Sequence, residues 1–128
     1  MDSTTLLLHG MTAIIHMKIY MKGDYNMQWT IDGKEYDTDT AKCVGSYKNT
    51  PYHNDANFYE EMLYRKKTGE FFLYGQGNTA SKYAEVRADR MRSPGEIIIP
   101  LTEDEAKNWV EQYGDVDTYI ELFGEVEE

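Results

Sequence analysis

Alternating apolar and polar residues in the first third of the chain predict β-strands. From Ile15 to Met21 every second residue is isoleucine or methionine, which gives one apolar face. Residues 27–31 alternate again, and Asp32-Gly33 separates them from residues 34–36. A type I′ turn needs positive φ at both central residues, so Asp-Gly between two such segments predicts a tight hairpin.

The middle of the chain predicts one strand and a second hairpin. Residues 43–47 have the composition of a strand. Residues 58–66 and 70–74 alternate on either side of Lys67-Thr68-Gly69, which predicts two strands joined by a short turn. We expect Gly75-Gln76-Gly77-Asn78 to end the second of these strands, because its glycines interrupt the apolar pattern.

The C-terminal third predicts a strand followed by two helices. Ile97-Ile98-Ile99 is a continuous apolar run, typical of a strand covered on both faces. Thr102 and Glu105 have the spacing of a capping box, and the apolar stripe that follows them reaches Tyr113. A second short helix is expected over residues 116–123, closed by a glycine. The side chains that we expect this helix to bury are Tyr119, Ile120 and Phe123.

These elements together predict an α+β fold: an antiparallel sheet of about five or six strands with one or two C-terminal helices packed on one face. We expect a single domain over residues 17–124, with residues 1–16 as an N-terminal extension or first strand and 125–128 as an acidic tail. No apolar run approaches the roughly 20 residues that span a bilayer, and the opening residues lack the charge pattern of a signal peptide. The expected location is the cytoplasm of a bacterial host cell, without membrane contact.

Negative charge is concentrated at the C-terminal end of the chain. The net charge is −10 overall, and residues 103–128 hold ten carboxylates and one cation, Lys107. Carboxylates held by helices attract basic surfaces, repel nucleic acid and can stand in for phosphates. The leading hypothesis is therefore a non-enzymatic interaction protein whose partner is a protein with a basic surface. The candidate partner-binding residues are Glu103, Asp104, Glu111, Asp115, Asp117 and Glu121. The other interpretation is a solvated helix face.

Basic residues interleaved with tyrosines support an alternative, a nucleic-acid-binding accessory protein. Three lie at the turn of the second hairpin and three in a mobile connection expected over residues 79–94. The alternative nucleic-acid-binding residues are Arg65, Lys66, Lys67, Arg87, Arg90 and Arg92. A pI of about 4.7 disfavours direct contact with nucleic acid. The third interpretation pairs these cations with acidic helices of the same or a neighbouring subunit, which leaves a homo-oligomer open.

The sequence shows no catalytic, metal or cofactor motif. His9, His16 and His53 lack the spacing of metal ligands. Cys43 is the only cysteine, so no intrachain disulfide forms, and its neighbours favour a small buried hydrophobe over a nucleophile. We therefore expect no enzymatic activity, no metal ion and no cofactor.

Two further patterns that could indicate a phosphate-binding or acid–base site have simpler structural explanations. Gly75-Gln76-Gly77 lacks the following helix and the lysine of a phosphate-binding loop, so a glycine bend at a strand end is favoured. Glu60 and Glu61 are adjacent carboxylates. Neighbours on a strand point to opposite faces of the sheet, so these two cannot share an acid–base site.

Three segments give the chain a resemblance to a group of known proteins. They are YDTDTA at residues 36–41, LYRKKTGEFFLYG at 63–75 and IPLTEDEA at 99–106. In these segments the chain resembles small uncharacterised proteins of phages and mobile elements in Gram-positive bacteria, over residues 34–124. Small acidic proteins of such elements include anti-CRISPR inhibitors, several of which occupy nucleic-acid grooves of their targets. The resemblance implies such an inhibitory role and transfers no functional residue.

Overall fold

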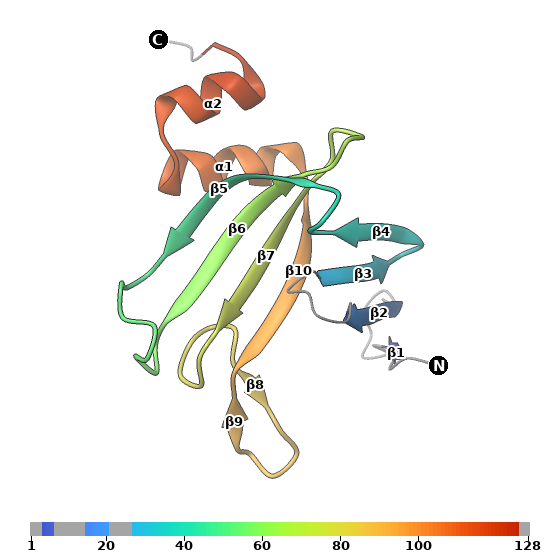
Figure 1. Ribbon diagram of the computed structural model, residues 1–128, viewed down its shortest axis with the longest axis vertical. Helices are drawn as coiled ribbons and strands as arrows, with labels where there is room; N and C mark the ends of the chain where they lie inside the picture. Colours follow the sequence, from blue (N-terminus) through green and yellow to red (C-terminus); the bar gives the residue numbers. More distant parts are fainter. Residues whose placement is uncertain (1–3, 7–14, 21–26, 126–128) are drawn as a thin grey trace. The chain divides into compact units, whose positions relative to one another are not determined.

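The computed structural model describes residues 4–6, 15–20 and 27–125, with side chains from residue 27 onward. The chain divides into two compact units, Met1–Lys42 and Cys43–Glu128. Each unit has its own four-stranded antiparallel sheet (Figure 1). The α+β fold with two C-terminal helices is confirmed, but its strands are divided between two sheets and a small hairpin. An alternating sequence pattern predicts where strands lie but not which strands pair, so it did not predict the division into two sheets. The assignment of residues 17–124 to one domain stays a prediction.

The first unit is a sheet in the order β1-β2-β3-β4. Its strands are β1 (Thr4–Leu6), β2 (Ile15–Tyr20), β3 (Met27–Ile31) and β4 (Lys34–Asp37). The hairpin predicted at Asp32-Gly33 is confirmed, with φ of 51° and 78° at these residues. Ile31 therefore pairs directly with Lys34 across a two-residue turn.

The second unit is built on a sheet in the order β10-β7-β6-β5. Its strands are β5 (Lys42–Lys48), β6 (Tyr59–Arg65), β7 (Phe71–Gly77) and β10 (Gly95–Leu101). The second predicted hairpin is confirmed as β6 and β7, in which Leu63 pairs with Leu73. Strand β7 does not stop at Gly75 as expected but continues to Gly77, which pairs with Gly95 of β10.

A small hairpin occupies part of the segment predicted as a mobile connection. Strands β8 (Glu85–Val86) and β9 (Arg92–Ser93) form a two-stranded sheet. The Arg87 amide donates to the carbonyl of Met91 at 2.9 Å, and Arg90 adopts a φ of 65° in the turn. The expectation of a mobile connection throughout is therefore wrong, because short-range backbone pairing organises this segment.

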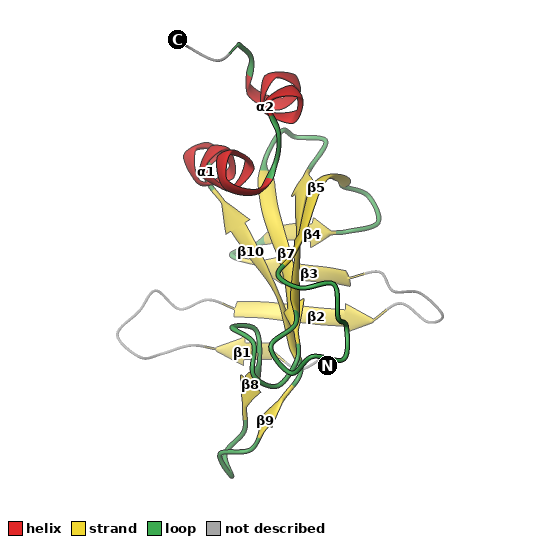
Figure 2. Ribbon diagram, turned by 90° about the vertical axis from the view of Figure 1, so that its left-hand side faces the viewer, coloured by secondary structure: helices red, strands yellow, loops and turns green. Residues whose placement is uncertain are grey.

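Both predicted helices are present, as α1 (Glu103–Tyr113) and α2 (Val116–Phe123). The capping box is confirmed: the Glu105 amide donates to the Thr102 hydroxyl at 3.1 Å, and the Thr102 amide donates to the Glu105 carboxylate at 2.8 Å. Asp115 caps α2 by accepting from the Thr118 amide at 2.8 Å. Figure 2 shows α1 against one side of the second sheet, near the end at which β10 leads into it.

The core of the second unit lies between this sheet and the helices. Its buried residues are Leu63, Phe71, Leu73, Ala106, Trp109 and Val110. Partly buried residues of α2 pack against this cluster, among them Leu122.

Two burial predictions are corrected by the structure. Tyr119, Ile120 and Phe123 of α2 are half-buried rather than buried, because the short helix covers the core at its margin. The apolar run of β10 is covered on both faces only in part: Ile98 is 2% exposed and Ile99 packs against the core cluster, whereas Ile97 is 40% exposed.

Candidate functional site

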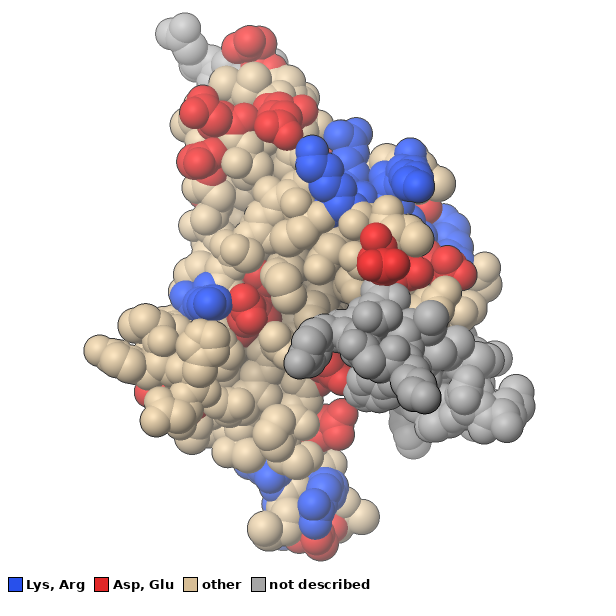
Figure 3. Space-filling model, in the orientation of Figure 1, with Lys and Arg blue, Asp and Glu red and all other residues tan. Residues whose placement is uncertain are grey.

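All six predicted partner-binding carboxylates are exposed on the two helices or their caps. Glu103, Asp104 and Glu111 belong to α1, Asp115 caps α2, and Asp117 and Glu121 belong to α2. Figure 3 shows acidic side chains gathered over the helical end of the second unit. Both helices are capped at their N-termini, so the backbone fixes where these carboxylates lie. The first requirement of the acidic-surface hypothesis, a folded scaffold, is met.

Most of this negative charge has no cationic partner within the described residues. There, Glu103 is the one member of the six in an ion pair, 3.5 Å from Lys107 Nζ. Two of the arginines upstream make other contacts: Arg92 Nε donates to the Thr79 carbonyl at 2.6 Å, and Arg87 pairs with Asp89 at 3.1 Å. The interpretation in which these arginines neutralise the helices of the same subunit is therefore not supported.

A groove of about 700 Å³ separates the two helices, and we call it the helix groove. Its apolar lining is Val110, Val116, Tyr119 and Phe123. Its charged lining is Glu111, Asp115, Glu125 and Lys107. Two of the predicted carboxylates, Glu111 and Asp115, thus line the same groove, whereas the other four lie outside its lining. A hydrogen bond from the Thr118 amide lowers the pKa of Asp115, so this carboxylate stays ionised at neutral pH.

The structure does not bring the six basic residues together. Arg65, Lys66 and Lys67 lie at the β6–β7 turn, close to the start of α1, because Phe71 pairs with Leu101. The other three belong to the β8–β9 hairpin, which precedes Gly95 at the opposite end of β10 (Figure 1). Seven residues of strand separate the two groups by roughly 20 Å. The nearer group is partly engaged, with Lys66 paired to Glu70 at 3.5 Å and the Arg65 guanidinium 5.4 Å from the Phe71 ring centroid.

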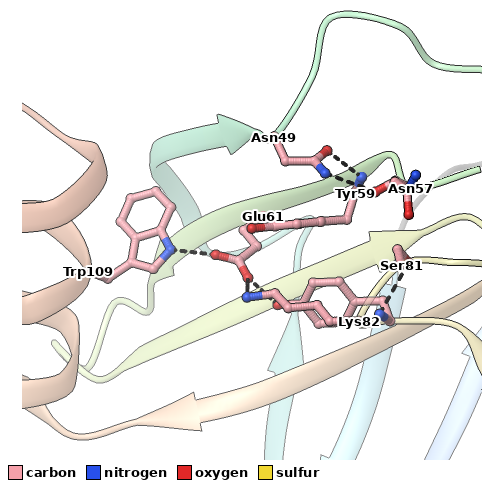
Figure 4. A network of polar contacts seen from close by, with 8 residues as sticks. Asn49, Asn57, Tyr59, Glu61, Ser81, Lys82 and Trp109 are labelled. Carbon is pink, nitrogen blue, oxygen red and sulfur yellow. Dashed lines mark hydrogen bonds and ion pairs between the residues drawn. The ribbon is translucent and has the colours of Figure 1, made fainter. Parts of the chain in front are cut away.

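A buried polar network that the sequence did not reveal lies on the helix-facing side of the second sheet. The carboxylate of Glu61, 2% exposed, accepts from three donors (Figure 4). Trp109 Nε1 of α1 lies at 2.9 Å, the Tyr83 hydroxyl at 2.5 Å and Lys82 Nζ at 2.6 Å. One side chain of β6 thereby connects the sheet to α1 and to the segment that follows β7.

The hydrogen bonds to Glu61 decide its protonation state. Burial alone would raise the pKa of Glu61, but the bonds from Lys82, Tyr83 and Trp109 together lower it below its usual value. Burial would likewise lower the pKa of Lys82, and the adjacent Glu61 carboxylate raises it instead. Burial and the bond to Glu61 raise the pKa of Tyr83. The network is therefore an ion pair with a neutral tyrosine donor at physiological pH. With its oxygens occupied by three donors, Glu61 is not placed to act as a general base.

Glycines in β7 explain how Tyr83 reaches Glu61. A methyl group at Gly75 would overlap the Tyr83 ring, and one at Gly77 would overlap the Ser81 side chain. Their bare backbone lets residues 81–83 lie directly on the sheet. The Gly75-Gln76-Gly77 pattern thus serves close packing. Glu60, on the opposite face, accepts from Gln76 at 3.2 Å, which confirms that Glu60 and Glu61 do not share a site.

Tyrosines surround the exposed side of this network. Tyr47 of β5 stacks on Tyr113 of α1 with ring centroids 4.1 Å apart, and Tyr59 lies 6.1 Å from Tyr47. Lys82 Nζ lies 4.8 Å from the Tyr59 ring centroid, within cation–π range. Among the described residues these rings hold α1 to the edge of the sheet. They explain part of the tyrosine bias of the sequence as packing around one buried ion pair.

Other candidate chemistry finds little support in the described part of the chain. Cys43 is exposed, so the expectation of a buried hydrophobe is wrong; it lies on the edge strand β5. His53 stacks on Phe58 with centroids 4.7 Å apart, and His9 lies outside the described residues. Within the described residues no three His, Cys, Asp or Glu side chains are grouped as metal ligands. There, too, no helix has the length and apolar character needed to cross a bilayer.

The helical end of the second unit combines exposed carboxylates with a partly apolar groove. Glu111 of α1 and Asp115, the N-cap of α2, both line that groove. Comparison of the chain with known protein families, with curated proteins and with solved structures found no match.

Proposed function

We propose that the protein is a non-enzymatic acidic interaction protein that binds a basic groove of a nucleic-acid-handling effector and inhibits it, as anti-CRISPR proteins of mobile elements do. It would act in the cytoplasm of a bacterial host. One observation carries the proposal: six exposed carboxylates stand on two capped helices, and among the described residues only Glu103 is paired with a cation.

Fixed carboxylates suit this role for two physical reasons. Unpaired charges on one surface steer a basic partner during diffusional encounter, most strongly at low ionic strength. Because capped helices position the carboxylates before binding, association requires little further ordering of the acidic surface. Nucleic acid carries the same sign of charge and competes for the partner's basic groove rather than for this protein.

The decisive experiment uses a purified CRISPR-associated nuclease loaded with its guide. Inhibition is measured as the loss of target cleavage, and competition as the release of labelled target DNA, followed by fluorescence anisotropy. The test variant carries Asp104→Asn, Glu111→Gln and Glu121→Gln, three exposed carboxylates without a capping role. We expect it to bind at least roughly tenfold more weakly than the wild type at low salt.

A matched control removes the same charge elsewhere. Glu35→Gln, Asp39→Asn and Glu85→Gln also remove three exposed carboxylates, all outside the helices. This control is expected to inhibit as the wild type does. If both triple variants retain full inhibition at the same low salt concentration, the acidic helices are not the contact surface. Capture from a bacterial lysate by the wild type but not the helix variant would identify a different effector.

A further inference from the structure

We propose that the helix groove binds a short basic segment of the partner, in which an apolar side chain sits on the groove lining and arginine or lysine side chains meet its carboxylates. The inference rests on the proposed function for the identity of the partner and goes further by naming the contact. The groove volume of about 700 Å³ lies within the roughly 300–1,000 Å³ of pockets that enclose small ligands. It therefore has room for a few side chains of a peptide.

Apart from Val110, which is 2% exposed, the apolar lining of the groove is surface that folding leaves partly uncovered. Val116, the first residue of α2, is 63% exposed. Tyr119 and Phe123 are half-buried: their rings lie 5.1 Å apart, and Phe123 also contacts Phe71 of the core at 5.4 Å. Since one side of these rings is already packed, they offer a rigid apolar surface to a ligand. Covering it gives a partner's leucine or methionine a favourable place to bind.

The charges of the groove select a cationic occupant. Glu111, Asp115 and Glu125 oppose the single cation Lys107, which leaves three carboxylates against one ammonium group. Lys107 is itself engaged, 3.5 Å from Glu103, which lies outside the groove lining. A neutral or acidic segment would desolvate these carboxylates without compensation, whereas arginine or lysine would pair with them.

One contact within the protein already resembles the proposed interaction. Lys107 Nζ lies 5.7 Å from the ring centroid of Phe123, a cation–π distance. The chain's own lysine therefore shows that a cationic side chain can lie against the aromatic lining of this groove. A partner arginine that approaches from the side of Glu125 or Asp115 would meet the same combination of ring and carboxylate.

The test uses two synthetic twelve-residue peptides of equal charge, one alternating arginine with leucine and one alternating arginine with serine. Binding to the full chain is measured by isothermal titration calorimetry at 150 mM salt, and the site is mapped by amide chemical shifts. We expect the arginine–leucine peptide to bind roughly tenfold more tightly. The shifts are expected at Val110, Val116, Tyr119 and Phe123.

Two pairs of substitutions with equal loss of charge locate the contact. Glu111→Gln with Glu125→Gln removes groove carboxylates, and Glu35→Gln with Glu85→Gln removes exposed carboxylates that belong neither to the groove lining nor to the helices. The first pair is expected to weaken binding of the arginine–leucine peptide about fivefold or more, and the second by less than about twofold. Val116→Ser, at a position that is 63% exposed, is expected to remove most of the preference for leucine.

The possible outcomes distinguish the groove inference from the proposed function. Equal weakening by both pairs, or equal affinity for the two peptides, would mean that a diffuse field and not the groove binds cations. That result would overturn the inference and leave the acidic-surface function intact. Groove-specific peptide binding by a protein that neither binds nor inhibits any effector would uphold the inference and refute the proposed function.

Discussion

Replacing Glu61 with alanine is expected to destabilise the second unit strongly, because it leaves two buried hydrogen-bond donors without an acceptor. The Trp109 indole and the Tyr83 hydroxyl would lose their acceptor beneath α1 and residues 81–83. A buried donor left unsatisfied costs about 1–3 kcal/mol, so two such groups cost about 2–6 kcal/mol. Lys82 is 51% exposed and becomes hydrated when Glu61 is replaced, so the loss of its ion pair adds little to the cost of this substitution. The free energy of unfolding should fall by several kcal/mol.

Urea unfolding followed by circular dichroism measures this change. With a slope of roughly 1–2 kcal/mol per molar urea for a small unit, Glu61→Ala should lower the midpoint by at least about 1 M. Glu61→Gln keeps one acceptor oxygen and is expected to cost less than alanine. Lys82→Met removes the half-exposed cation but leaves the buried Glu61 carboxylate with two donors, so it is expected to destabilise the fold by less than Glu61→Ala does.

The rank order of these three variants in free energy of unfolding distinguishes the contribution of the ion pair from that of the buried hydrogen bonds more clearly than any single value does. If Lys82→Met costs more than Glu61→Ala, the counter-charge of Lys82 outweighs the two buried hydrogen bonds, which refutes the dominance of the buried donors. A urea midpoint for Glu61→Ala within about 0.3 M of the wild-type midpoint would likewise refute the dominance of the buried donors. Unchanged far-ultraviolet spectra in native buffer would show that all three variants begin from the same fold.

Three further predictions concern the network and the basic residues. Because the folded pKa of Glu61 is lowered, its ionisation stabilises the fold fully above the usual glutamate value of 4.5 and loses this effect as pH falls below it. The stability difference between wild type and Glu61→Gln, from urea titrations at several pH values, should therefore be constant above about pH 5.5 and shrink below pH 4.5. Gly75→Ala should destabilise by about 2 kcal/mol or more in the same assay, since Tyr83 must move, whereas Ser46→Ala on the exposed face of β5 should stay within about 0.5 kcal/mol. Gel-shift titrations with single-stranded and duplex DNA at 150 mM salt should show no binding tighter than about 10 μM, and a tighter complex that weakens steeply with salt would favour the nucleic-acid-binding alternative.

Local signals predicted most of the secondary structure of the second unit. The capping box at Thr102 and Glu105 placed the start of α1, and the glycine after Phe123 placed the end of α2, because a helix end depends on only a few neighbouring residues. Turn chemistry likewise located the β3–β4 hairpin at Asp32-Gly33. In each of these cases the determining contacts lie within a few residues of one another in sequence.

The buried network and the helix groove could not be predicted in that way. Glu61 and Trp109 are 48 residues apart, and nothing local marks them as partners. The one available signal was a carboxylate at an inward-facing position of β6, opposite Gly75 in β7. The groove depends on how α1 and α2 cross, which no short stretch of sequence determines, and Glu125 of its lining was assigned to a tail.

The junction between β10 and α1 contains no hinge. Leu101 ends the strand, Glu103 begins the helix, and the single residue between them, Thr102, is engaged in the capping box. Helix α1 therefore cannot swing relative to the sheet without breaking its own first turn. A partner meets the anions of α1 in one orientation, so its encounter with them should follow simple second-order kinetics with no preceding isomerisation. Differences in residence time between partners would then report how well each one fits, and not how readily this protein rearranges.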